Sequence, residues 1–122
     1  MAEKTSRGPD QSAAPANVAT ITIPAGQSVS TTLTITTGAL QMLISPDDWT
    51  PANVSFLVSA DNVRFVDLYD MGVEVLRPMG PDRGAVVPAP LTQAVLYLKI
   101  RSGPSTNPVP QEADRVFQCV VL

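Results

Sequence analysis

The sequence predicts an all-β fold, an antiparallel β-sandwich of jelly-roll type with an extended N-terminal arm. Twelve prolines and seven glycines divide the 122 residues into short segments, which suit short strands and tight turns better than long helices. Several segments alternate apolar and polar residues with a period of two, the pattern of a half-buried strand. About eight or nine such strands separated by turn signals favour a sandwich or barrel, with a jelly roll as the preferred version.

The chain divides into two parts after residue 16. Residues 1–16 are rich in alanine, serine, proline and charge and show no periodicity, so we interpret them as an arm that would not fold alone. Residues 17–122 are expected to form a single β-sandwich domain with one modest core. Because a proline-rich arm loses little entropy on ordering, we expect it to contact neighbouring subunits through residues such as Arg7, Pro9 and Pro15.

The first strands alternate clearly. The segment 18–23 separates Ala19, Ile21 and Ile23 from the threonines on its other face. The segment 28–36 is expected to be one continuous strand, because apolar residues and threonines alternate along it. Its apolar face would hold Val29, Thr31, Leu33 and Ile35.

A β-hairpin is expected in the middle of the chain. The segment 54–59 would direct Val54, Phe56 and Val58 inward, and 63–69 would return after a turn at Asp61–Asn62. No segment of the sequence has a convincing helical pattern. The remaining expected strands are 39–45, 72–76, 85–87, 95–101 and 115–122.

The composition argues against most catalytic chemistry. There is no histidine, which removes the commonest general base and the commonest zinc ligand. The single cysteine, Cys119, lies in an apolar run, where we expect a small buried side chain rather than a nucleophile. No nucleophile elbow, P-loop or dinucleotide-binding glycine motif occurs. We therefore expect no enzymatic activity, no metal and no cofactor.

Two classes of partner also lack support. The formal net charge is −3 and no basic run occurs, so the sequence does not favour nucleic-acid binding. No apolar stretch approaches the roughly 20 residues of a membrane span. The N-terminal residues also lack the apolar region of a secretory signal.

Several side chains are candidates for binding a protein partner. Tyr97, Lys99 and Arg101 alternate on one strand, so their shared face is expected to meet solvent or an acidic partner. Arg64, in the predicted hairpin, is a further candidate. Trp49 lies in a loop beside two acids, where it could stack on a sugar, anchor an interface or close one end of the sandwich. The last of these is the preferred interpretation.

The same hairpin offers a weaker alternative. Asp61, Asn62, Asp67 and Asp70 carry oxygen atoms of the kind that calcium prefers. Their spacing does not match the EF-hand loop, so we favour turn residues and solvated edges over a calcium site.

Two segments carry a resemblance to a known class of protein. The pattern W-x-P-A-x-V-S-F-x-V-S-A-D-x-V-x-F-x-D-L-Y-D spans Trp49 to Asp70, Y-L-K-I-R-S-G spans Tyr97 to Gly103, and A-D-R follows at 113–115. Together they resemble small β-rich virion proteins of tailed bacteriophages. The chain departs from that pattern at Asn62–Val63, where Asp-Gly is expected. The S-x-D-x-x-x-F phrase is also similar to discoidin-type carbohydrate-binding jelly rolls.

The phage resemblance implies a capsid decoration, or cement, protein. Such proteins are small β-rich domains, often trimers, whose arms lie over neighbouring capsomers. The expected partners are the major capsid protein or other virion proteins and further copies of the chain, with a trimer favoured. The expected location is the capsid exterior, after a soluble stage in the host cytoplasm. The alternatives are a tail, collar or fibre-attachment protein, and a carbohydrate-binding module for host adsorption.

Overall fold

The structure, a computed structural model, describes residues 17–122. The predicted arm, with Arg7, Pro9 and Pro15, lies outside the described residues. The described strands are β1 (Asn17–Ile23), β2 (Leu33–Thr34), β3 (Leu40–Ile44), β4 (Val54–Ser59), β5 (Val66–Asp67), β6 (Tyr69–Asp70), β7 (Val73–Glu74), β8 (Leu76–Arg77), β9 (Gly84–Val86), β10 (Tyr97–Ser102) and β11 (Arg115–Val121). One short helix, α1 (Ala89–Thr92), occurs in a connection where none was expected.

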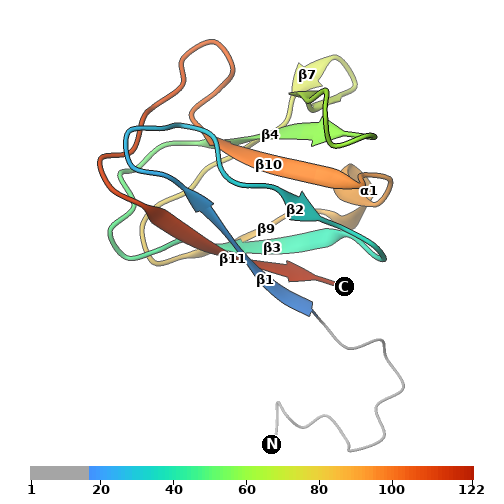
Figure 1. Cartoon of the computed structure of the whole chain (residues 1–122), viewed down its shortest axis with the longest axis horizontal. Helices are drawn as coiled ribbons and strands as arrows, with labels where there is room; N and C mark the ends of the chain where they lie inside the picture. The colour runs from blue at the N-terminus through green and yellow to red at the C-terminus, as the bar shows by residue number, and fades with distance from the viewer. Residues whose placement is uncertain (1–16) are drawn as a thin grey trace, which may run out of the picture.

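The strands form two larger sheets and one small ribbon, and every registered pair among the described residues is antiparallel. The first sheet has the order β1-β11-β3-β9. The second has the order β2-β10-β4-β5, and β8 also pairs with β4. The ribbon is the β6–β7 pair (Figure 1). The predicted all-β, antiparallel class is therefore confirmed.

Both sheets contribute side chains to one hydrophobic core. The first sheet supplies Ile21 and Phe117, and the second supplies Phe56, Leu98 and Ile100, all of them almost fully buried. In Figure 1 the β4–β10 layer lies on one side of this core and the β11–β3 layer on the other. The alternation in the sequence thus identified Ile21 and Phe56 correctly as inward residues.

The expected strand at 28–36 is wrong in length. Only Leu33–Thr34 is a strand, and Val29 forms an isolated bridge with Arg101. The Ser30 hydroxyl donates to the Thr31 carbonyl at 2.7 Å and accepts from the Ile100 N–H at 2.9 Å. A serine side chain has therefore replaced a backbone partner in the ladder, which is how such residues compete with regular structure.

The predicted hairpin exists, but its second strand divides. After the turn, β5 pairs with β4, and then β6 leaves the sheet to pair with β7. The chain returns as β8 to pair with β4 beside β5. The ribbon therefore stands out from the edge of the second sheet, held at its base on both sides (Figure 1).

Candidate functional site

The outer face of the second sheet is built from two neighbouring strands. Tyr97 pairs with Ser59, Lys99 with Leu57, and Arg101 with Ser55, so these six side chains share the face away from the core. The sequence correctly grouped the three β10 residues. The structure shows, however, that they do not have the same surroundings.

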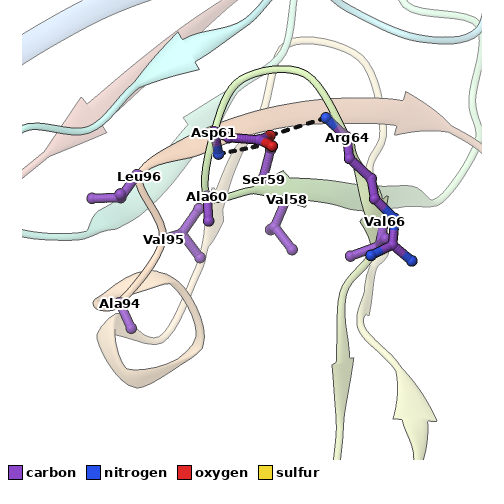
Figure 2. Close-up of a pocket in the computed structure, with 9 residues that line it drawn as sticks. All are labelled: Val58, Ser59, Ala60, Asp61, Arg64, Val66, Ala94, Val95 and Leu96. Carbon is purple, nitrogen blue, oxygen red and sulfur yellow. Dashed lines mark hydrogen bonds between the residues drawn. The ribbon is translucent and has the colours of Figure 1, made fainter.

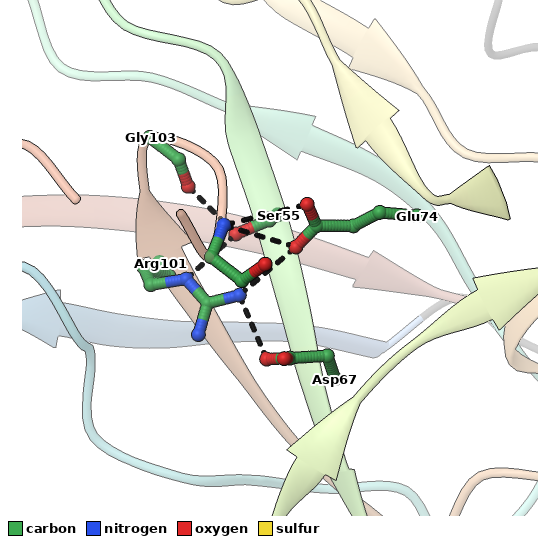
Figure 3. A network of polar contacts seen from close by, with 6 residues as sticks. Ser55, Asp67, Glu74, Arg101 and Gly103 are labelled. Carbon is green, nitrogen blue, oxygen red and sulfur yellow. Dashed lines mark hydrogen bonds and ion pairs between the residues drawn. The ribbon is translucent and has the colours of Figure 1, made fainter. Parts of the chain in front are cut away.

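Arg101 is the centre of a buried polar network. Only 7% of the residue is exposed, although it points away from the hydrophobic core. Its Nη2 atom lies 2.8 Å from an Asp67 carboxylate oxygen and 3.1 Å from a Glu74 oxygen, and its Nε donates to the Ser55 hydroxyl at 3.0 Å (Figure 3). The Ser55 hydroxyl in turn donates to the Gly103 carbonyl at 2.7 Å.

This network corrects the prediction that Arg101 faces solvent or a partner. Its acidic partners belong to the same chain: Asp67 lies in β5 and Glu74 in β7. The Glu74 carboxylate also accepts from the Ser105 N–H at 3.1 Å. Removing Arg101 would leave the mostly buried Glu74 without its cation, so the network ties β7 and the residue that precedes the ribbon, Asp67, to β10.

The ribbon presents apolar side chains at its far end. Met71 is 95% exposed, and Tyr69 and Val73 beside it are also exposed. Met71 and Gly72 both have positive φ, 52° and 80°, as a two-residue type I′ hairpin turn requires. Asparagine is the usual residue where methionine stands here, because methionine has no polar side chain to support a left-handed backbone. An exposed, unfavourably placed methionine on a fixed support is a candidate anchor for a partner protein.

Lys99 and Tyr97 are only partly available. The Lys99 ammonium lies 4.3 Å from the centre of the Phe65 ring, so a cation–π contact within the chain holds it. Tyr97 is half-buried beside it. The contact with Phe65 therefore holds Lys99 within its own chain.

Trp49 closes the core, as preferred from the sequence. It is 2% exposed, and its ring meets Phe117 edge-on, with 5.0 Å between the centroids and an angle of 85°. The alternative in which Trp49 is an exposed sugar platform or interface anchor is therefore wrong. The adjacent Asp48 forms an ion pair with Arg115 at 2.9 Å.

The turn after β4 is organised by Asp61. Its carboxylate accepts from the N–H groups of Arg64 and Val63 and from the Ser59 hydroxyl. These bonds, that from Arg64 first, lower the pKa of Asp61. Since Asp67 is bound to Arg101, the four residues of the calcium alternative do not gather. In residues 17–122 no group of three acidic or cysteine side chains is placed to hold a metal.

An apolar pocket of about 420 Å³ opens between this turn and the segment that leads into β10 (Figure 2). Arg64 lies at one side of it, and Asp61 is already engaged in the turn. The walls are mainly aliphatic and comprise Val58, Ala60, Val66, Ala94, Val95 and Leu96. Such a pocket suits an apolar side chain of a partner.

Two polar residues in the interior were not predicted from the sequence. Arg115 and Gln111 are almost fully buried and bond to each other at 2.9 Å. Arg115 lies on the same face of β11 as the core residues Phe117 and Cys119, and this alternation could have predicted its burial.

Cys119 itself is fully buried, and burial raises the pKa of its thiol to about 12.

No protein-family model matches the chain, and neither a curated protein nor a solved structure is significantly similar to it. The described residues contain no helix with the length and hydropathy needed to cross a bilayer. The functional proposal therefore rests on the ribbon, its polar base and the sheet topology.

Proposed function

We propose that the described domain is a jelly-roll sandwich. When β5 to β8 are counted as one interrupted strand, the first sheet reads 1-8-3-6 and the second reads 2-7-4-5. Most connections then cross from one sheet to the other, as the paired Greek keys of a jelly roll require. The single core between the sheets supports this assignment.

We further propose that the protein is a non-enzymatic virion protein, a capsid decoration or cement protein that binds the major capsid protein lattice and stabilises the head. The observation that carries this proposal is the exposed methionine on a fixed ribbon. A projecting apolar anchor whose support is ordered before binding loses little entropy on docking, which suits attachment to a preformed surface. The protein would act as a homo-oligomer, with a trimer favoured, on the capsid exterior.

The residues behind the phage resemblance belong to this same unit. The first pattern ends in the ribbon at Tyr69–Asp70, and it contains Ser55 and Asp67 of the network. The second pattern contains Arg101 and Gly103. The resemblance therefore follows the part of the fold that presents the anchor, which supports the proposal.

The decisive experiment compares capsid binding by two variants. Met71→Asn removes the apolar anchor and places a favourable residue in the turn, so the domain should fold at least as well while its affinity for empty capsids of the parent phage falls tenfold or more. Val63→Asn is the matched control, because Val63 is an exposed valine in another turn. Co-sedimentation measures both, and equal binding by Met71→Asn and wild type would contradict the proposal.

The predicted arm needs its own test. Deleting residues 1–16 should leave the domain folded but reduce capsid binding, and full binding by the truncated protein would reject a role for the arm. The number of copies per particle separates this proposal from a tail or collar location: hundreds of copies indicate the shell, and about a dozen or fewer indicate the tail or neck.

A further inference from the structure

The outer face of the first sheet carries an apolar row that crosses all four strands. The register pairs Val18 with Val120, Val120 with Met42, and Met42 with Val86. Paired residues in adjacent strands point to the same side, so these four side chains lie in one line across the sheet. They alternate with core residues such as Phe117 and Leu43, which places the row on the side away from the core.

The row is open to solvent at both ends. Val18 at one edge is 63% exposed, and Val86 at the other is 58% exposed. The Met42 side chain lies beside Gly84, since a β-carbon built at that glycine would be 3.3 Å from the Met42 sulfur. The side chains that surround the row on this face are Thr20, Thr22, Ile44, Val116 and Gln118.

None of the outward side chains in the registered pairs of these four strands is charged. The contrast with the second sheet is complete, because lysine, arginine and aspartate lie on that outer face. In a strand with one face in water, apolar residues on the buried face usually alternate with charged or strongly polar residues on the exposed face. An apolar, uncharged face is instead typical of the centre of an interface between identical subunits.

We propose that copies of this chain associate through the outer face of the first sheet. Each copy has a formal net charge of −3, so an uncharged face is where two copies can approach with the least repulsion. The flanking threonine and glutamine side chains can both donate and accept hydrogen bonds, so a second copy can satisfy them. A charged partner would have to bury its charge on this face without a counterion.

The size of the face sets the strength of association. Four strands spaced about 4.8 Å apart and roughly 17 Å long give on the order of 300–400 Å², which is less than the ~800 Å² per partner of a standard interface. The sheet face alone therefore supports reversible association.

The inference names the surface for the homo-oligomer that the proposed function includes. Its test uses the full chain without capsids, so its failure would leave the Met71 capsid experiment unaffected. The measurement is the mass in solution by sedimentation equilibrium, from micromolar to near-millimolar concentration. Wild type should exceed the 12.9 kDa monomer mass as concentration rises.

Three lysine substitutions distinguish this face from the rest of the surface. Met42→Lys should keep the chain monomeric, because charge at the centre of the row repels the same charge on a second copy. Met71→Lys makes the identical change on the ribbon and should associate like wild type. Val18→Lys, at a more exposed position, should also weaken association tenfold or more and protects the test against misfolding of the Met42 variant.

Either a dimer or a trimer that Met42→Lys and Val18→Lys dissociate supports the inference. Wild type that stays monomeric throughout the range overturns it. Association of both face variants with wild-type affinity also overturns it.

Discussion

The outer faces of the two large sheets differ in the charge and in the burial of their side chains. On the second sheet, charged side chains occupy the face, and Asp67 in β5 and Glu74 in β7 neutralise Arg101. On the first sheet, the outward side chains of the registered pairs carry no charge, and Met42 and Val120 are half-buried while Val18 and Val86 at the edges are exposed. Alternation in the sequence assigns a residue to one face of its strand. Whether that face is buried depends on segments that are distant in the sequence.

The difference also separates the two proposed contacts. The second sheet uses its internal ion pairs to hold a projecting anchor, which suits attachment to a different protein. The first sheet presents a flat, uncharged face, which suits a copy of itself. Substitutions on the second sheet should therefore change stability and capsid binding. Substitutions on the outer face of the first sheet should change self-association.

The largest effect is expected at Arg101. Arg101→Met leaves Asp67 and Glu74 without their cation, and we expect a loss of about 3 kcal/mol in the free energy of unfolding, near the low end for broken buried pairs because Asp67 is partly exposed. Urea denaturation measures it. Lys99→Met on the same face is the control and should cost less than about 1 kcal/mol.

Neutralising the acids as well sharpens this test. A triple variant with Arg101→Met, Asp67→Asn and Glu74→Gln should recover part of the lost stability, because no unpaired charge remains. If the triple variant is no more stable than Arg101→Met, the loss comes from packing and not from charge.

The next largest effect is the difference in unfolding free energy between two glycine-to-alanine variants. Gly103, beside the network, has φ +90°, and an added β-carbon would lie 2.5 Å from the Asn107 carbonyl oxygen. Gly103→Ala should therefore cost about 2 kcal/mol or more of unfolding free energy. Gly84→Ala on the first sheet meets only the flexible Met42 side chain and should stay within about 1 kcal/mol. Equal thermal shifts for the two variants would contradict this.

Cys119, on the inner side of the first sheet, predicts a pH effect. Burial raises its pKa in the folded protein from 9.0 to about 12. The unfolded chain therefore loses the thiol proton first as pH rises, so this contribution to stability is complete below pH 9 and is lost as pH rises towards about 12. Between pH 8 and pH 10, wild type should lose about 1 kcal/mol more than Cys119→Ala, measured by urea denaturation. Parallel pH profiles would refute the prediction.

Met71→Asn should produce a smaller change of opposite sign. An asparagine tolerates the left-handed backbone at φ 52° better than methionine, so we expect a gain of about 0.5 kcal/mol in unfolding free energy. Thermal denaturation measures it. A loss of stability would show that Met71 packs on its own chain and is not a free anchor.

The smallest expected effect is that of salt on self-association. Because the outer face of the first sheet is uncharged, raising sodium chloride should leave the association constant unchanged or slightly higher, as repulsion between the negative copies is screened. Sedimentation at low and high salt measures this. Strong dissociation by salt would point to ion pairs and away from this face.

Much of the fold could be predicted from local pattern. Ile21 and Ile23 in β1 and Phe56 in β4 point inward as their alternation indicated, and Cys119 in β11 is buried as expected. Trp49 closes the core as preferred, because a large aromatic beside turn residues can still reach back into the interior. The strand at 28–36 was overestimated, since alternation does not reveal a serine that bonds to the backbone in place of a strand partner.

The candidate site could be predicted only in part. Tyr97, Lys99 and Arg101 were grouped correctly, but the burial of Arg101 depends on Glu74, which is 27 residues away in the sequence. The ribbon was expected only as parts of two ordinary strands, because its departure from the sheet depends on β5 and β8 pairing with successive parts of the same edge of β4.

By itself, the sequence determined the class of fold, the inward residues of β1 and β4 and the lack of histidine chemistry, because period and composition are local properties. Only the tertiary structure decided which outward residues are covered and which stay open. Arg101 and Met42 both point away from the core, but Arg101 is buried against acidic side chains of its own chain while Met42 is only half-buried. That outcome depends on register between distant strands, where a shift of one residue would exchange the two faces.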